Sequence, residues 1–254
     1  MSARAAELMS DPMTPAAPLQ AAPDLFELQL SFNLFPATYA HWSWIEQLGF
    51  CELSADPAGL PTASTYWIRS VSDALLTEFA LEQQFDFDFS SARKRVALLD
   101  ADAAIILAKH VAAILLRERF RTVIAREAVA ELRAKVGADA HRFALQFDGD
   151  VPRLTGLAEQ LTWCATEHWD RYMAALVAAC LPEGAFGVHG RLQLRFPNTW
   201  ATAEPVLAVR ACDGATLGNL FTTVARHLPI APSRLFDVDA SMPMPAPPHL
   251  ETSP

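Results

Sequence analysis

The stretch from Ala101 to Leu116 is apolar on almost every side of a helix drawn through it. Such a helix has to be surrounded by other elements, because apolar surface exposed to water is unfavourable. Asp100 precedes it and is a good N-cap, since its carboxylate accepts from free amides of the first turn. Asp102, Lys109 and His110 interrupt the stretch, and a membrane span would have to bury these ionisable groups. The pattern therefore predicts a helix at the centre of a protein core.

The composition supports a large helical core. Hydrophobic residues make up 52% of the 254 residues and charged residues only 19%, while glycine is scarce, with 10 residues. Packed helices fit this balance better than a turn-rich sheet protein. We therefore expect a mainly α fold, with one globular helical domain over residues 24–236. The N-terminal tail at 1–23 and the Pro-rich C-terminal tail at 237–254 are expected to be disordered.

Helical spacing of apolar residues predicts several further helices. They are expected at Pro36–Leu48, Trp67–Leu81, Arg117–Val136, from Pro152 to about Pro182, and Thr216–Leu228. In the third of these, Phe120, Ile124, Ala128 and Leu132 are expected to face the core. In the fourth, the apolar stripe includes His168, which we interpret as a core histidine.

Alternation with a period of two residues predicts a minor β ribbon. RLQLRF at 191–196 alternates strictly, and parts of 205–210 do the same. Leu25–Leu34 alternates in part, which is typical of a half-buried strand or extended segment. FDFDF at 85–89 fits either a short strand or a loop that docks on a partner.

Charge and signal content restrict the partners and the compartment. The formal net charge of −9 argues against nucleic acid as the main partner, because phosphate binding needs a basic surface. The N-terminal segment has no apolar signal region, so we expect a cytoplasmic protein without direct membrane insertion. Cys51, Cys164, Cys180 and Cys212 form no CxxC pair, and buried reduced thiols are the favoured interpretation.

Metal and phosphate sites have only weak candidates. Cys164 and His168 lie one helical turn apart and could share an ion with Cys180 or His189, although a hydrogen-bonded core histidine is the ordinary explanation. Gly184, Gly187 and Gly190 are spaced by three, but no lysine-serine pair or helix start follows them. We expect no metal and no cofactor.

Catalytic residues are not recognisable either. The chain has no G-x-S-x-G motif. Asp86 with Asp88, or Asp148 with Asp150, could pair as acid and base, but carboxylates two apart in a turn are more often solvated. A hydrolase whose site forms only in three dimensions remains the rival interpretation.

Two surface groups are candidates for partner binding. Arginines concentrate after the central apolar stretch, at Arg117, Arg119, Arg121 and Arg126. The ordinary explanation is the wet face of an amphipathic helix; the alternative is a docking face for an acidic partner. Trp42 and Trp44 point in nearly opposite directions on a helix, so one of them could lie at an interface.

The order of several short motifs resembles the type III secretion sorting-platform adaptors, the SctK (YscK-like) family. FELQLSFNLFPATYAHWSWI at 26–45 is similar to that family's opening, with Pro36, Tyr39 and His41 matching. DALLTEFAL at 73–81 and LQLRFP at 192–197 resemble two later elements, and the apolar block at 98–145 resembles the centre more loosely. The similarity extends over roughly 25–210 in matching order.

The resemblance implies a non-enzymatic adaptor. Its partners would be the cytoplasmic domain of the inner-membrane ring protein and the C-ring-like pod protein, which leads to the ATPase assembly. A secretion chaperone or another scaffold is the remaining alternative. For partner contacts we expect the Pro36–Trp44 segment (Pro36, Tyr39, His41, Trp44) and the arginine face (Arg117, Arg119, Arg121, Arg126).

Overall fold

The structure, a computed structural model, describes residues 25–50, 65–201, 213–228 and 234–237. The predicted tails, apart from Asp237, lie outside the described residues, as do Cys51, Cys212 and the predicted strand at 205–210. The division into one domain over 24–236 stays a prediction. No helix within the described ranges is both long and apolar enough to cross a membrane.

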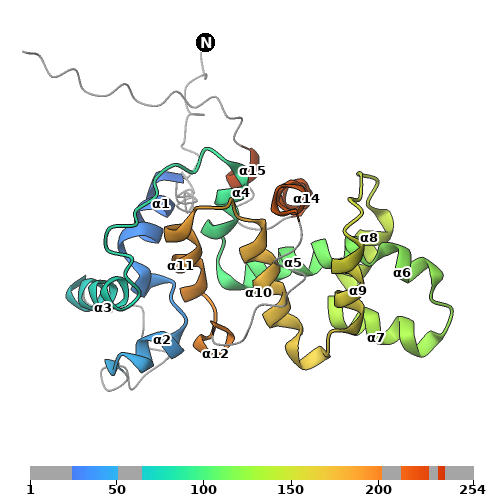
Figure 1. Cartoon of the computed structure of the whole chain (residues 1–254), viewed down its shortest axis with the longest axis horizontal. Helices are drawn as coiled ribbons and strands as arrows, with labels where there is room; N and C mark the ends of the chain where they lie inside the picture. Colours follow the sequence, from blue (N-terminus) through green and yellow to red (C-terminus); the bar gives the residue numbers. More distant parts are fainter. Residues whose placement is uncertain (1–24, 51–64, 202–212, 229–233, 238–254) are drawn as a thin grey trace, which may run out of the picture.

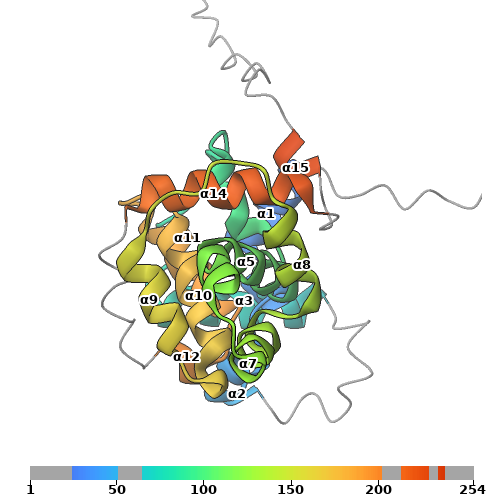
Figure 2. The same cartoon turned by 90° about the vertical axis from the view of Figure 1, so that its right-hand side faces the viewer.

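The central helix is α5, Ala101–Leu115, and its predicted burial is confirmed. Asp100 is its N-cap, and the Asp100 Oδ1 atom accepts from the Ala103 amide at 2.7 Å. Leu107 and Val111 are fully buried. The helices that pack most extensively on α5 are α8 (Ala138–Gln146), α10 (Trp169–Cys180) and α14 (Gly214–His227). Figure 2 shows α5 in the middle of these helices.

The main hydrophobic cluster continues from α5 toward both ends of the chain, from Phe32 to Phe236. It includes residues of α1 (Leu25–Leu34), η4 (Val96–Leu98), α11 (Phe186–Leu194) and α15 (Arg234–Asp237). The short α4 (Ala92–Arg95) directly precedes η4. The short η5 (Thr166–His168) leads into α10, and α12 (Asn198–Ala201) follows α11.

The two ends of the molecule are built differently (Figure 1). One end contains η1 (Pro36–Thr38), α2 (Trp42–Gln47) and α3 (Thr65–Glu78). These elements enclose a smaller hydrophobic cluster around Trp44, Leu75 and Leu81. The other end contains α6 (Arg117–Thr122), α7 (Arg126–Val136), α8 and α9 (Thr155–Trp163). The predicted helices at 67–81 and 216–228 are confirmed as α3 and α14.

The predicted β ribbon is wrong, since the described part of the chain contains no strand and the 191–196 segment belongs largely to α11. Val188, Arg191, Leu192 and Arg195 are buried, which is helical spacing with two arginines on the inner face. The alternating pattern led to a wrong prediction because we assumed that the two arginines face the solvent.

The expected strand at 25–34 is helix α1. Leu25, Leu28 and Phe32 contact the core at helical spacing, while Phe26 is 61% exposed. FDFDF at 85–89 forms no strand and is a loop. The apolar residues of 25–34 fit periods of both 2 and 3.6, so the local pattern could not decide between a strand and a helix.

The predicted helix at 117–136 is interrupted between α6 and α7. Ile124, expected in the core, is 96% exposed, whereas Phe120 and Leu132 are buried as predicted. Three consecutive β-branched residues, Thr122 to Ile124, explain the break, because they lose side-chain freedom in a helix. α7 ends at Val136, the predicted end of this helix, and Gly137 follows it with φ of 92°.

Two other predicted helices are also divided. Pro36 begins only the η1 turn, and α2 begins after His41. The helix expected from Pro152 begins at Thr155, ends at Trp163 and resumes as α10 at Trp169. The break at residues 164–168 leaves His168 exposed, so its interpretation as a core histidine is wrong.

Replacing Leu107 by alanine tests the central position of α5. The side chain is fully buried, so its loss should lower the free energy of unfolding by about 2–5 kcal/mol in urea denaturation followed by circular dichroism. The matched control is Ile106→Ala on the same helix, where the side chain is 48% exposed and the expected loss is below about 1 kcal/mol. Equal losses for both variants would contradict the arrangement.

Candidate interaction surfaces

The Pro36–Trp44 segment divides into packed and exposed residues. Pro36 is buried, and Trp44 is only 5% exposed. The Trp44 Nε1 donates to the Phe196 carbonyl at 2.8 Å, and its ring meets Phe79 edge to face at 4.8 Å. Pro36 and Trp44 therefore stabilise this end of the fold from within. Their surfaces are not available to a partner in this conformation.

Tyr39 and His41 lie closer to the surface. Tyr39 is half-buried; its hydroxyl donates to the Phe32 carbonyl at 2.8 Å, and the Arg195 guanidinium lies 4.4 Å from its ring centroid. Burial raises the pKa of Tyr39, so the hydroxyl keeps its proton for that hydrogen bond. His41 is exposed, and its Nδ1 accepts from the Ser43 amide at 3.2 Å as the N-cap of α2.

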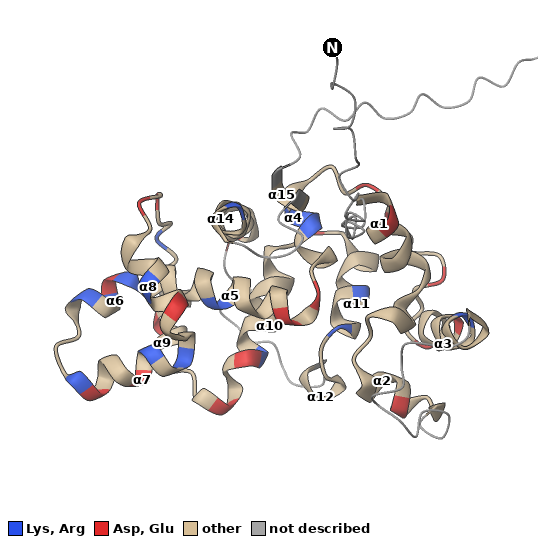
Figure 3. Ribbon diagram, turned by 180° about the vertical axis from the view of Figure 1, so that it is seen from behind, with Lys and Arg blue, Asp and Glu red and all other residues tan. Residues whose placement is uncertain are grey.

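The arginine face lies at the opposite end of the molecule (Figures 1 and 3). Arg119, Arg121 and Arg126 are exposed, and Arg121 pairs with Glu118 at 3.3 Å on the same helix. Arg117 is half-buried, and its Nη1 donates to the Phe147 carbonyl at 2.8 Å, which joins α6 to the end of α8. Three of the four predicted arginines are therefore available to solvent.

An open hollow of about 310 Å³ adjoins this face, between α7 and residues 162–166. Arg119, Lys135 and Trp163 are among its lining residues, and Trp163 is 80% exposed. The Pro36–Trp44 segment and the arginine face thus lie at separate ends of the molecule. The exposed Trp163 side chain lies at the same end as the arginine face.

The proposed metal ligands do not converge. Cys164 is buried while His168 is exposed, because the chain leaves helical geometry between them. The Cys180 Sγ lies 3.0 Å from the Val177 carbonyl, and His189 lies against the Pro182 carbonyl. Within the described ranges no three His, Cys, Asp or Glu side chains gather as a metal site. Burial raises the pKa of Cys164 to about 11, which keeps this thiol protonated near neutral pH.

The carboxylates of Asp86 and Asp88 bind groups of their own loop. Lys94 Nζ lies 2.8 Å from Asp86 and 3.7 Å from Asp88. Asp86 Oδ1 accepts from the Asp88 amide at 3.0 Å, and Asp88 Oδ1 accepts from the Ser90 amide at 3.1 Å. Hydrogen bonds from Ser90 lower the pKa of Asp88. These contacts fix the backbone of a turn.

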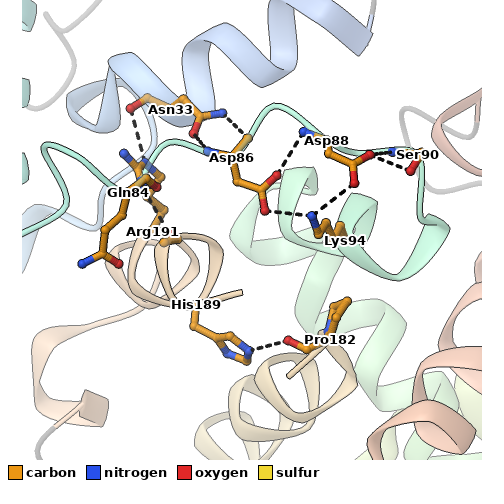
Figure 4. A network of polar contacts seen from close by, with 10 residues as sticks. Asn33, Gln84, Asp86, Asp88, Ser90, Lys94, Pro182, His189 and Arg191 are labelled. Carbon is orange, nitrogen blue, oxygen red and sulfur yellow. Dashed lines mark hydrogen bonds and ion pairs between the residues drawn. The ribbon is translucent and has the colours of Figure 1, made fainter. Parts of the chain in front are cut away.

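The residues 81–90, which we call the clamped loop, are held by buried polar side chains that the sequence did not reveal (Figure 4). Asn33 is fully buried; its Nδ2 donates to the Asp86 carbonyl at 2.7 Å, and its Oδ1 accepts from the Asp86 amide at 2.9 Å. The side chain of one helix thereby pairs with both polar backbone groups of one loop residue.

Arg191 of α11 completes the clamp. Its guanidinium is fully buried and donates to the carbonyls of Gln84 at 2.8 Å and Leu81 at 3.0 Å. It also donates to the carbonyls of Asn33 and Gly187. Burial lowers the pKa of Arg191, since desolvation disfavours the charged form. Helical spacing of Val188, Leu192 and Arg195 around Arg191 is the signal that could have placed this side chain inside.

Two glycines of the series, Gly187 and Gly190, allow the clamped loop to approach α11. A Cβ on Gly187 would lie 2.1 Å from the Gln84 carbonyl oxygen, and one on Gly190 would lie 2.7 Å from Leu81 Cδ2. Gly184 has φ of 82° and follows the end of α10. Of the three glycines considered as a phosphate cradle, Gly187 and Gly190 thus form a small-residue face for packing, and Gly184 serves the turn before α11.

One family model matches most of this chain. The model is described as YOP proteins translocation protein K (YscK), and it matches residues 27–228. The chain belongs to the YscK family. No curated protein and no solved structure matches it. Membership in the YscK family implies a type III secretion protein and confirms the resemblance seen in the sequence.

Replacing Gly187 by alanine tests the packing of the clamped loop on α11. The added methyl group has no space against the Gln84 carbonyl, which is backbone, so the free energy of unfolding should fall by about 1–3 kcal/mol. Gly156→Ala in α9 is the control, because nothing lies within 4 Å of its Cβ position. That substitution should leave the thermal midpoint unchanged or raise it slightly. An undiminished midpoint for Gly187→Ala would refute the close approach.

Proposed function

We propose that this chain is a non-enzymatic adaptor of the type III secretion sorting platform. It links the cytoplasmic domain of the inner-membrane ring protein to the C-ring-like pod protein, and through the pod to the ATPase assembly. It acts in the cytoplasm, against the inner-membrane face of the apparatus. The observation that carries the proposal is the family match over residues 27–228.

The arrangement of the surfaces supports a bridging role. A bridge needs two separate contact areas. The exposed His41 beside α2 and the exposed arginines of α6 belong to opposite ends of the molecule. Both ends are joined to α5 or to the main cluster by packed helices. A rigid body of this kind fixes the distance between two bound partners. Neither rival, hydrolase or chaperone, is favoured by a specific contact in the described residues.

A ternary assembly tests the bridging role. The full chain is mixed with the purified ring domain and the pod protein of the same secretion system, and complexes are separated by size-exclusion chromatography with light scattering. We expect the ring domain and the pod protein to co-elute only when the adaptor is present. Binding to neither protein, or competition between them for the adaptor, would count against the proposal.

Charge reversal at the arginine face tests one of the two contact areas. Arg119→Glu with Arg121→Glu should weaken one partner by about tenfold at low salt, because the partner would then meet like charge. Both side chains are exposed, so the circular dichroism spectrum should not change. Arg69→Glu, an exposed site on α3 at the other end, is the control for that partner. Unchanged affinity in the double variant would exclude the arginine face as a contact.

A further inference from the structure

Three phenylalanines lie exposed together on the clamped loop and the start of α11. Phe85 is 44% exposed, Phe87 45% and Phe186 75%. The rings of Phe85 and Phe87 stack with centroids 6.4 Å apart, and Phe85 and Phe186 line the same open hollow of about 400 Å³. We call this group the phenylalanine ridge. Single exposed apolar residues are common on proteins, but a contiguous aromatic group indicates an interaction site.

The ridge is held in place before any partner binds. Asn33, Arg191 and Lys94 fix the backbone between Leu81 and Ser90 by the contacts described above. Arg191 also lies 5.3 Å from the centroid of the Phe85 ring. Phe89, the next aromatic residue in the loop, turns inward, is 1% exposed and meets Phe32 edge to face. A preformed ridge loses little conformational entropy on binding, so more of its contact energy appears as affinity.

Acidic residues flank the three phenylalanines along the chain. Glu82 and Glu183 are exposed, and the Asp88 side chain is 71% exposed. The cations beside the ridge are not open to solvent: Lys94 is only 16% exposed and is engaged by Asp86 and Asp88, and Arg191, next to the Phe85 ring, is fully buried. An apolar centre with an acidic border fits a partner surface that has an apolar recess with a basic border. Opposite charges orient the two surfaces, and a partner with an acidic border would be repelled.

We propose that the phenylalanine ridge is the docking site for a protein partner that presents an apolar recess bordered by lysine and arginine. The inference rests on the proposed adaptor function, in that this partner is one of the two proteins that the chain bridges. The ridge is a contact area distinct from the arginine face, whose charge is of the opposite sign.

Titration calorimetry of the full-length chain against the ring domain and the pod protein, each alone, tests this assignment. Phe85→Ala with Phe87→Ala should weaken one of the two partners by about thirtyfold or more and leave the other unchanged. The affinity for that partner should also fall with rising salt. Glu183→Lys should weaken it severalfold and reduce its salt dependence.

The matched control is Ile124→Ala with Trp163→Ala, which removes two apolar side chains, 96% and 80% exposed, at the opposite end. It should not weaken the ridge-dependent partner. Thermal melts establish that the ridge variant is folded; if its midpoint falls, the single variant Phe186→Ala replaces it, and should weaken the same partner.

The possible results separate the two proposals. Wild-type affinity for both partners in the ridge variant overturns the ridge and leaves the adaptor function standing. A wild-type chain that binds neither partner overturns the adaptor function and the ridge with it. The wild-type chain could also form a homodimer in light scattering that the ridge substitutions dissociate. That result would identify a second copy of this chain as the occupant of the ridge and would overturn the proposal of a partner with a basic border.

Discussion

The buried guanidinium of Arg191 is the interaction on which the arrangement of three segments depends. A positive charge without water is costly unless its donors are satisfied. Here the acceptors are backbone carbonyls from α1, the clamped loop and α11. The planar fork of arginine can reach several acceptors at once, whereas an ammonium group at this position could not reproduce the same geometry. Segments distant in sequence are thereby held in a fixed relation.

Other buried or half-buried arginines make similar contacts around the main cluster. Arg95 donates to the carbonyls of Phe89 and Leu235, and Arg93 donates to those of Cys180 and Gly214. Arg195 donates to the Ala97 carbonyl beneath the ring of Tyr39. Short helices and loops end close together in this region, and carbonyls at their ends need donors. Arginine supplies these donors where regular secondary structure does not.

The sequence correctly predicted those helices that can be located from their own pattern of apolar residues. The α5 helix could be located because it is apolar on all sides and begins at an N-cap, and α3 and α14 because their stripes are regular. Prediction failed for α11 because Arg191 and Arg195 were assumed to face water, although carbonyls far away in the sequence satisfy them. At the candidate surfaces, the exposure of Arg119, Arg121 and His41 agrees with a surface position, but the burial of Trp44 depends on Phe196 and Phe79. Contacts of this kind arise only in the tertiary fold.

The use of amide oxygens as acceptors has a consequence for acid tolerance. A carboxylate that holds an arginine loses its charge when it takes up a proton, and the bond weakens. Peptide carbonyls do not titrate in the range that living cells meet, so the grip of Arg191 on Leu81 and Gln84 is the same in mild acid as at neutrality. The backbone that carries the exposed rings of Phe85 and Phe87 is therefore held, on the side of α1 and α11, by contacts that acid does not remove.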